Sequence, residues 1–347
     1  MDAVAALNEI AFWLERGRAD TFKVQAFRKA AGIIGPLGPG EVEARARDGR
    51  LKSMKGIGDR TYQVIRQAVE GAVPDYLEDL RQRGAEPLAD GGKLHSALRG
   101  DLHSHSDWSD GGSPIALMAD AARLLGREYL ALTDHSPNLK IANGLSAERL
   151  TEQLDVVAAM NAAGPAGDGA QDGATGFRLL SGIEVDILET GELDQAPELL
   201  DRLDIVVASV HSKLRADRGT MTQRMLKGVR DPHTNVLGHC TGRLLEGSRG
   251  TRPQSEFDAR KVFSACAEHS VAVEINSRPE RQDPPDELIQ LALDAGCLFS
   301  IDSDAHAPGQ LDFLQYGAER AALNNVPAER IITTWPLQRL LEWSAGS

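Results

Sequence analysis

Apolar and polar residues follow two different patterns along the chain, and the change near residue 100 divides it into two regions. Up to about residue 85, apolar residues recur every three to four positions, and glycine or proline separates the segments. This pattern predicts helices over residues 4–15, 21–34, 40–49, 60–71 and 74–84. From residue 100 onward, short apolar segments typical of buried strands alternate with longer amphipathic segments typical of helices.

The second region contains seven strand-like segments. They cover residues 100–106, 128–136, 177–187, 204–212, 234–240, 271–277 and 298–306. Strands that alternate with helices predict a parallel sheet, which we expect to be closed as a barrel. The expected organisation is a helical domain at 1–85, a linker at 86–99 and a barrel domain at 100–347. Residues 163–176, rich in glycine, alanine and aspartate, are expected to form a surface insertion without chemistry.

Composition and charge narrow the class of protein. No segment approaches the roughly 18 consecutive apolar residues of a membrane span. We read residues 1–20 as an amphipathic helix and not a signal peptide. Three widely spaced cysteines do not make a disulfide framework, so we expect a cytoplasmic protein. Because the sequence shows no membrane span, we expect no membrane partner. The net charge is −13, but residues 1–100 hold 16 Lys and Arg against 14 Asp and Glu. The acidity therefore lies in the second region, and nucleic-acid binding by the first region remains open.

Six of the nine histidines and three acidic residues lie at the ends of the predicted strands. These residues are His103, His105, Asp110, His135, Glu184, His211, His239, Asp304 and His306. Each one alone is more typical of a cap or a turn. However, the C-terminal ends of parallel strands meet at one rim of an α/β barrel, where active sites are built. The sequence therefore predicts a multinuclear metal site. Imidazole and carboxylate ligands without paired thiols suit two to three Zn²⁺, Mn²⁺ or Fe²⁺ ions.

The sequences of these segments resemble the PHP (polymerase and histidinol phosphatase) domain. They are most similar to the PHP domain appended to bacterial family X DNA polymerases. The similar segments are "DLHSHSDWSDG", "SGIEVDIL", "ASVHS", "GHCTGRLL" and "EINSRPERQD". The resemblance implies a distorted (β/α)7 barrel with up to three metal ions. It assigns His103, His105, Glu184 and Asp304 to the first ion, Glu184, His211 and His239 to the second, and Asp110, His135 and His306 to the third.

The first region resembles the helix-hairpin-helix domain that begins the same polymerases. "LKSMKGIGDRTYQVI" contains its apolar-x-Gly-apolar-Gly signature at Gly56 and Gly58. Glycine lets the backbone approach a DNA phosphate, and the amides at the start of the next helix bind it. Lys55 and Arg60 flank this turn and add positive charge. We therefore expect DNA to be the partner of this domain.

In related domains a lysine eight residues after the first hairpin glycine forms a Schiff base with a deoxyribose aldehyde. Counting from Gly56 reaches Val64, which has no nucleophile. The lysine common four residues after that glycine is replaced by Arg60, which is too basic to attack a carbonyl. The resemblance therefore predicts DNA binding without this lyase chemistry.

Residues 86–99 are too few to hold a polymerase palm, so we expect no polymerase activity. The expected enzyme is a metal-dependent phosphoric ester hydrolase of DNA repair, either a 3′–5′ exonuclease or an enzyme that processes 3′ ends or abasic sites. Arg281, Lys213 and Arg243 follow strand ends and are candidates for binding phosphate, while Asn276 is a candidate for orienting a ligand or water. Three alternatives stay open: a small-molecule phosphatase of the histidinol-phosphatase type, a DNA-binding regulator without catalysis, and a repair scaffold that binds other proteins in addition to catalysis.

Overall fold

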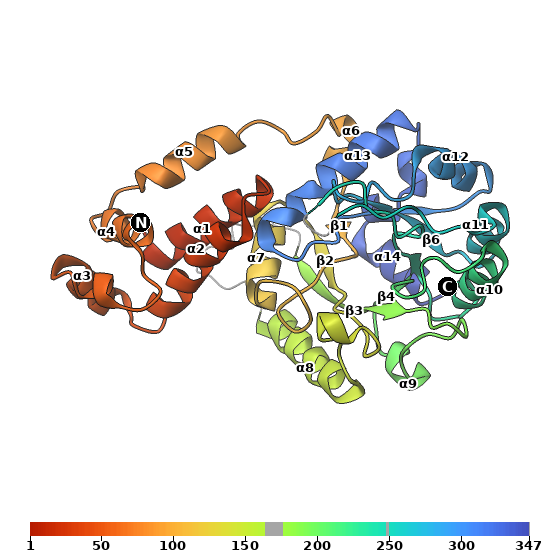
Figure 1. Cartoon of the computed structure of the whole chain (residues 1–347), viewed down its shortest axis with the longest axis horizontal. Coiled ribbons are helices and arrows are strands. Elements are labelled where there is room, and N and C mark those ends of the chain that lie inside the picture. Colours follow the sequence, from red (N-terminus) through yellow and green to blue (C-terminus); the bar gives the residue numbers. More distant parts are fainter. Residues whose placement is uncertain (164–175, 248–249, 347) are drawn as a thin grey trace. The chain divides into compact units, whose positions relative to one another are not determined.

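The computed structural model describes residues 1–163, 176–247 and 250–346. It divides into two compact units (Figure 1). The first consists of Met1–Pro87 with Pro308–Gln310, and the second of Leu88–Ala307 with Leu311–Ser347. Most of the predicted insertion at 163–176 lies outside the described residues. In the parts of the chain that are described, no helix is long and apolar enough to cross a membrane.

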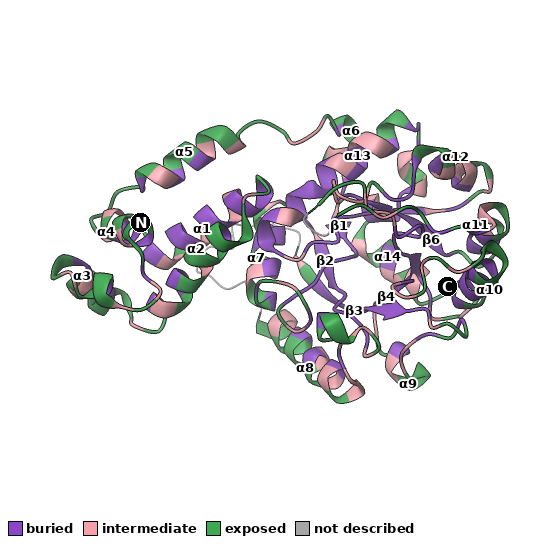
Figure 2. Ribbon diagram, viewed as in Figure 1, coloured by how far each residue is buried: buried purple, intermediate pink, exposed green. Residues whose placement is uncertain are grey.

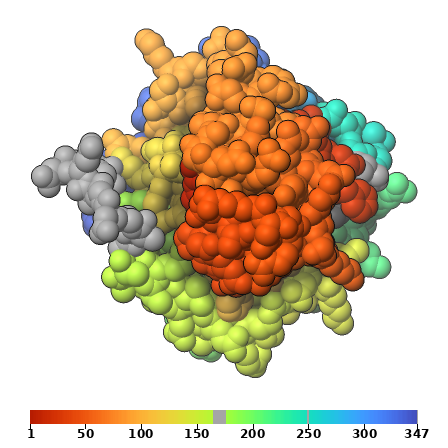
Figure 3. Space-filling model, turned by 90° about the vertical axis from the view of Figure 1, so that its left-hand side faces the viewer, coloured from red at the N-terminus to blue at the C-terminus, as the bar shows by residue number. Residues whose placement is uncertain are grey.

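The first unit is built from the predicted helices, and its surface is drawn in red and orange in Figure 3. They are α1 (Ala3–Arg16), α2 (Thr21–Ile34), α3 (Pro39–Arg47), the 3₁₀ helix η1 (Arg50–Ser53), α4 (Asp59–Val69) and α5 (Asp75–Gly84). Aspartates cap the first two helices: Asp2 accepts from the Ala5 amide at 2.7 Å, and Asp20 from the Phe22 amide at 2.9 Å. Apolar residues at helical spacing pack into one core, which contains Leu7, Phe27 and Ile65.

The second unit contains a sheet of seven parallel strands in the order of the chain, β1 to β7. The strands are β1 (Gly100–Asp101), β2 (Tyr129–Leu132), β3 (Arg178–Asp186), β4 (Ile205–Ser209), β5 (Val236–Leu237), β6 (Ala272–Asn276) and β7 (Phe299–Asp302). A parallel bridge between Ser104 and Ala305 joins the segments that follow the first and last strands, so the sheet is nearly closed. The predicted parallel α/β barrel preceded by a helical domain is confirmed.

Helices surround the sheet, and the strands between them are almost wholly buried (Figure 2). The helices are α7 (Ile115–Leu124), α8 (Ala147–Ala163), α9 (Pro197–Leu200), α10 (Arg218–Val229), α11 (Ala259–Glu268), α12 (Asp286–Asp294), α13 (Leu314–Leu323) and α14 (Leu337–Ser344), with the 3₁₀ helices η2 (Lys140–Ala142), η3 (Pro308–Phe313), η4 (Ala328–Arg330) and η5 (Ile332–Thr334). Strands covered on both faces read as continuous apolar runs, as "IVVAS" does in β4. Residues inside the barrel, among them Leu102, Tyr129 and Val207, form a separate cluster.

The segment at 86–99 is more structured than the expected linker. It contains the short helix α6 (Gly92–Ala97), and its residues from Leu88 onward belong to the second unit. Leu98 is buried in the barrel core, and Leu94 packs against the same core. The glycine-rich sequence concealed these contacts, because the segment contains few apolar residues.

Candidate metal centre

The structure brings all nine predicted ligands together at the C-terminal ends of the strands. They form four overlapping groups whose ligand atoms lie within 4.8 Å of one another. The groups are His105, Asp110, His135 and His306; His103, His105 and Asp304; His103, Glu184 and His239; and His135, Glu184 and His211. The three other histidines belong to no such group among the described residues. Strand-end position therefore separates the clustered histidines from the rest.

The backbone explains this convergence. His103 and His105 are two residues apart in an extended segment, so both side chains point to the same face. A parallel bridge places His135 beside Glu184 on the neighbouring strand. Asp304 has a left-handed backbone with a φ of 50°, which is uncommon for a residue other than glycine and turns its side chain at the end of β7.

Glu184 is the centre of the cluster. Its Oε1 lies 2.8 Å from His239 Nε2 and 3.1 Å from His211 Nε2. Its Oε2 lies 2.8 Å from His135 Nδ1 and 3.4 Å from His103 Nε2. A carboxylate with imidazoles on both oxygens has the arrangement of a ligand that bridges two cations. The grouping differs in part from the expected one, since His135 joins the Glu184 group as well as the Asp110 group.

Many buried ligand atoms have no hydrogen-bond partner among the described residues. They are Nε2 of His103, both ring nitrogens of His105 and of His211, Nδ1 of His135 and of His239, and Oε2 of Glu184. Some approach a carboxylate oxygen closely but outside hydrogen-bond geometry, as His135 Nδ1 does. A buried polar atom without a partner costs about 1–3 kcal/mol. Nitrogen and oxygen donors left without protein partners fit divalent cations, which would satisfy them.

The electrostatic interactions around Glu184 favour an ionised carboxylate and protonated neighbouring histidines. Burial opposes ionisation of Glu184, but the imidazoles, led by His211, outweigh it and hold its pKa well below the usual value. Burial likewise opposes protonation of His103, yet the Glu184 and Glu274 carboxylates raise its pKa well above the usual value. At His135, burial again opposes protonation, but the Glu184 carboxylate outweighs burial and raises the pKa of the imidazole to about 10. In the absence of cations, protons on these histidines therefore balance the negative charge of the carboxylates.

The outer end of the cluster differs. Burial, together with the neighbouring His306 and His135 rings, lowers the pKa of His105 to about 3. Burial opposes ionisation of Asp110, but hydrogen bonds from His135 and His306 keep its pKa below the usual value. Asp304 is also buried, and the Arg281 guanidinium lowers its pKa well below the usual value. His105 is therefore a neutral donor between two ionised carboxylates.

Two buried carboxylates that sequence analysis missed orient the clustered histidines. Glu274 Oε1 lies 2.7 Å from His103 Nδ1, and its Oε2 accepts from the His239 amide at 2.5 Å. Asp186 Oδ1 accepts from the His211 amide at 3.1 Å and lies 3.6 Å from His211 Nδ1. Such outer carboxylates fix the tautomer and orientation of metal-binding imidazoles. The signal in the sequence was an acidic residue within an otherwise apolar strand segment.

The predicted phosphate-binding residues have more specific positions than expected. Arg281 donates from Nε to Asp304 Oδ2 at 3.1 Å, and Asn276 Nδ2 donates to the same oxygen at 3.1 Å. Arg243 donates to the carbonyls of Arg281 and Gln282, so its guanidinium fixes the Arg281 turn. Lys213 is exposed beside His211 with a left-handed φ of 52°.

Sequence analysis also missed a second arginine at this rim. Arg278 Nη1 donates to the Asp304 carbonyl at 3.0 Å and lies 3.0 Å from His306 Nδ1. Its sequence signal was its place in "EINSRPERQD", three residues before Arg281. Arg278 and Arg281 thus both contact Asp304.

In the helical unit, the predicted hairpin lies between η1 and α4. Gly56 has a φ of 102°, which favours glycine, and a Cβ there would approach Ile33 Cδ1 to 2.7 Å and Lys29 Cε to 2.9 Å. The Gly58 amide donates to Thr61 Oγ1 at 2.9 Å. As at the start of any helix, the first amides of α4 have no intrahelical acceptor. Lys55 and Arg60 are exposed beside this turn.

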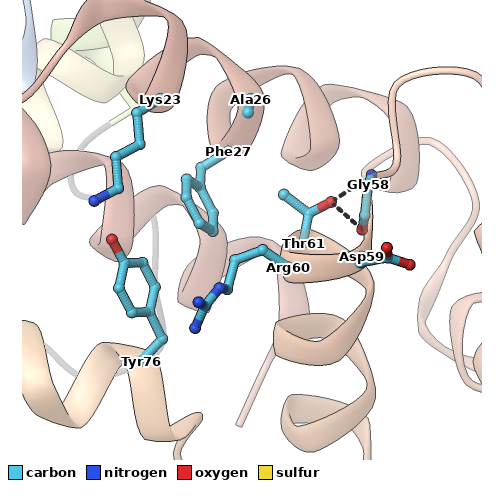
Figure 4. A pocket seen from close by; sticks show the side chains of 8 residues that line it. All are labelled: Lys23, Ala26, Phe27, Gly58, Asp59, Arg60, Thr61 and Tyr76. Carbon is cyan, nitrogen blue, oxygen red and sulfur yellow. Dashed lines mark hydrogen bonds between the residues drawn. The ribbon is translucent and has the colours of Figure 1, made fainter.

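A pocket opens at the start of α4 (Figure 4). Eight residues line it: Lys23, Ala26, Phe27, Gly58, Asp59, Arg60, Thr61 and Tyr76. Lys23 Nζ lies 5.5 Å and the Arg60 guanidinium carbon 5.0 Å from the centre of the Tyr76 ring. Among the described residues, neither cation forms a salt bridge, so both can bind an anion. Lys23 and Tyr76 were absent from the sequence-predicted set.

Two family models match the chain. The one described as the PHP domain matches residues 101–278, and the one described as a helix-hairpin-helix domain matches residues 1–72. The first range covers all of the clustered side chains except Asp304 and His306.

The curated relatives that the chain resembles differ in their named activities. The chain is 37% identical over 224 residues to the DNA polymerase/3′–5′ exonuclease PolX of Bacillus subtilis, and this match covers 65% of the chain but 37% of that relative. It is 26% identical over 257 residues to the probable phosphatase YcdX of Escherichia coli, covering 70% of the chain and 92% of that relative. A solved histidinol phosphate phosphatase of Lactococcus lactis, with zinc, L-histidinol and phosphate, is 15% identical with a TM-score of 0.41, over 72% of this chain and 95% of that one.

Proposed function

The chain belongs to the PHP domain family, whose model matches residues 101–278, and we propose that it is a metal-dependent phosphoesterase that acts on DNA. Its activity is 3′–5′ exonucleolytic cleavage or the processing of 3′ ends and abasic sites, without polymerase activity. One observation carries the hydrolytic part: nine clustered side chains whose buried ligand atoms largely lack protein partners. The DNA part rests on the hairpin and the cationic pocket of the helical unit.

The nine residues of the cluster would hold the cations, and the Glu184 carboxylate would be shared between two of them. Two to three Zn²⁺, Mn²⁺ or Fe²⁺ ions match this set of imidazoles and carboxylates. When bound, such ions polarise phosphoryl oxygens and lower the pKa of a water molecule towards neutrality. Glu274 and Asp186 hold the His103 and His211 rings in the orientation that ligation requires.

The side chains around Asp304 position both the ligand and the substrate. Arg281 and Asn276 fix Asp304 Oδ2, so this carboxylate keeps its direction when the substrate arrives. Because only Nε of Arg281 contacts Asp304, its terminal nitrogens remain to bind a phosphate oxygen. Lys213, exposed beside His211, adds a second positive charge for the DNA backbone.

The helical unit binds the DNA backbone through the start of α4. Free amides at a helix start attract phosphate because they donate hydrogen bonds and carry the positive end of the helix dipole. Arg60 and Lys55 add charge at this point, and Gly56 and Gly58 keep the backbone accessible. None of these contacts reads a base, so binding is independent of sequence.

A second candidate function is a phosphatase for small phosphomonoesters. The similarity to YcdX, which extends over 92% of that protein, favours it. The same metal centre serves either substrate, since both reactions attack a phosphorus atom. The helical unit favours DNA over a small phosphomonoester as the substrate, because a small metabolite does not need a domain that binds the phosphate backbone.

The test compares the two substrates on the same protein. End-labelled single-stranded and gapped DNA, incubated with Mn²⁺ or Zn²⁺, should give a ladder from the 3′ end, and EDTA should abolish it. In parallel, phosphate release from histidinol phosphate is measured. His103→Ala should remove the DNA activity and lower the metal content, whereas His269→Ala, outside the cluster, should change neither. Faster hydrolysis of histidinol phosphate with intact DNA would reject the DNA proposal in favour of the phosphatase.

A further inference from the structure

Asp110 differs from the other clustered residues in how the fold places it. The others lie within a strand or within four residues of its last residue, whereas Asp110 lies nine residues after the end of β1. Its side chain is 29% exposed, and it belongs to the loop between β1 and α7. Strand geometry and burial therefore do not fix its position, and some other contact must.

That contact comes from Asp134, which directly precedes His135 and is completely buried. Its carboxylate accepts four hydrogen bonds: from the Ser106 amide at 2.8 Å, the Ser106 hydroxyl at 2.6 Å, the Ser109 hydroxyl at 2.5 Å and Gln153 Nε2 at 2.7 Å. Gln153 is itself buried in α8, so this helix anchors the carboxylate from behind. Asp134 thus ties the β1–α7 loop to the end of β2.

The other side of Asp110 is held by the backbone. The Gly111 amide donates to the Ser106 carbonyl at 2.9 Å, and the Gly112 amide donates to the His306 carbonyl at 2.7 Å. A Cβ on Gly111 would lie 2.6 Å from the Ser106 carbonyl oxygen, so only glycine closes the loop this tightly. Both neighbours of Asp110 are consequently fixed, Ser109 through Asp134 and Gly111 through Ser106.

We propose that Asp134 is a positioning residue that acts through Ser109 to hold Asp110 against His135 and His306, and so creates the outermost cation site. Asp110 Oδ1 lies 3.3 Å from Nε2 of each histidine. Because Asp134 is bonded to His135 along the chain and to Ser109 by a hydrogen bond, one carboxylate sets the distance between two ligands. This inference rests on the proposed metal centre. It adds that Asp134 positions the ligand Asp110, which the outer cation site needs.

The test uses two serine variants of the same loop in the full chain. Ser109→Ala removes the hydroxyl that links Asp110 to Asp134, which keeps its other three hydrogen bonds. Ser113→Ala is the matched control, since Ser113 Oγ is buried without a hydrogen-bond partner among the described residues. Zn²⁺ affinity and stoichiometry are measured by chelator competition and elemental analysis. We expect Ser109→Ala to bind one ion about 10- to 100-fold more weakly, with the remaining ions and the Ser113→Ala control unchanged.

A double-mutant cycle separates positioning from general destabilisation. Asp110→Ala should lose the same ion, and adding Ser109→Ala to it should cause no further loss, because Ser109 acts only through Asp110. Asp134→Asn should weaken the same ion as Ser109→Ala does. If Ser109→Ala binds Zn²⁺ like Ser113→Ala, or if its effect adds to that of Asp110→Ala, the positioning role is wrong. Wild-type protein that binds no Zn²⁺, Mn²⁺ or Fe²⁺ would instead contradict the proposed function itself.

Discussion

The barrel and the helical unit build their polar sites in opposite ways. The barrel buries its charged groups: the side chains of His103 and Glu184 are 0% and 1% exposed. The helical unit keeps Lys55 and Arg60 in solvent. Buried charges require compensation by neighbours, whereas exposed ones are solvated and screened by salt. In the proposed metal centre, one change would therefore disturb many coupled atoms, whereas the proposed DNA-binding surface would be a sum of weak contacts.

Glu184→Gln breaks this coupling most directly. The amide is nearly isosteric but neutral, and its nitrogen would face an imidazole nitrogen on one side, so two cation positions lose their shared ligand. We expect hydrolysis to fall by more than the roughly 100-fold typical of an outer-sphere partner, with loss of bound metal. Elemental analysis and the rate on bis-nitrophenyl phosphate measure both effects.

The matched control for this change is Glu128→Gln at the opposite end of the barrel, where Glu128 pairs with Arg99 and is 21% exposed. It makes the same chemical change outside the cluster. We expect wild-type metal content and rate. Equal losses in the two variants would show that the barrel as a whole, and not the bridging carboxylate, responds to the substitution.

The pH dependence of metal binding is the second test of coupling. In the metal-free protein, burial opposes protonation of His135, but Glu184 and Asp110 outweigh it and raise its pKa to about 10. A cation must displace that proton, so Zn²⁺ affinity should rise by about tenfold per pH unit for each proton released. Calorimetry in buffers of different ionisation enthalpy counts these protons. Affinity that is constant between pH 6 and 8 would contradict protonated histidines.

The same raised pKa affects the stability of the metal-free protein. A histidine whose pKa is higher in the folded state stabilises it below the unfolded value of about 6.5. This contribution from His135 disappears as the pH rises through about 10. The unfolding midpoint of the metal-free protein should therefore fall from pH 7 to pH 10 relative to that of the metal-loaded protein.

Much of the fold and of the cluster follows from sequence periodicity. The apolar runs of the barrel and the helical spacing before residue 85 specify strands and helices, and strand order follows from the alternation. The position of His103, His135 and His211 at strand ends then predicts their convergence, because parallel strands present their C-terminal ends on one rim.

The residues that support the ligands were not predictable in this way. Glu274 and Asp134 lie in apolar strand segments, where an acidic residue has no periodic pattern. The histidines that Glu274 contacts are 35 and 171 residues away in the chain, and the partners of Asp134 are 19 to 28 residues away. Lys23 and Tyr76 meet Arg60 only because three helices pack around Phe27. Contacts of this kind depend on tertiary packing, which a local pattern does not contain.

Arg60→Ala tests the independent contacts of the helical unit, and its effect should be smaller. Loss of one phosphate contact should weaken DNA binding uniformly across sequences and reduce the slope of log affinity against log salt by about 1. Arg83→Ala is the control, because it removes the same charge from an exposed residue that is paired with Asp79. Fluorescence anisotropy at several salt concentrations measures both slopes. Identical slopes would exclude Arg60 from the phosphate contacts.

The last prediction is that the helical unit has no Schiff-base activity, so this test should give no signal. Val64, at the position where related domains carry the reactive lysine, is 1% exposed within the core, and it has no amine. Arg60 lines the pocket, and its guanidinium is too basic to attack a carbonyl. Borohydride treatment of the protein with 5′-deoxyribose-phosphate DNA should therefore leave no covalent adduct, and any cleavage at abasic sites should depend on metal ions. Lys23 is the amine that lines the pocket. An adduct that disappears in Lys23→Ala would show that this lysine replaces the missing one, and the division of labour between the two units would then be wrong.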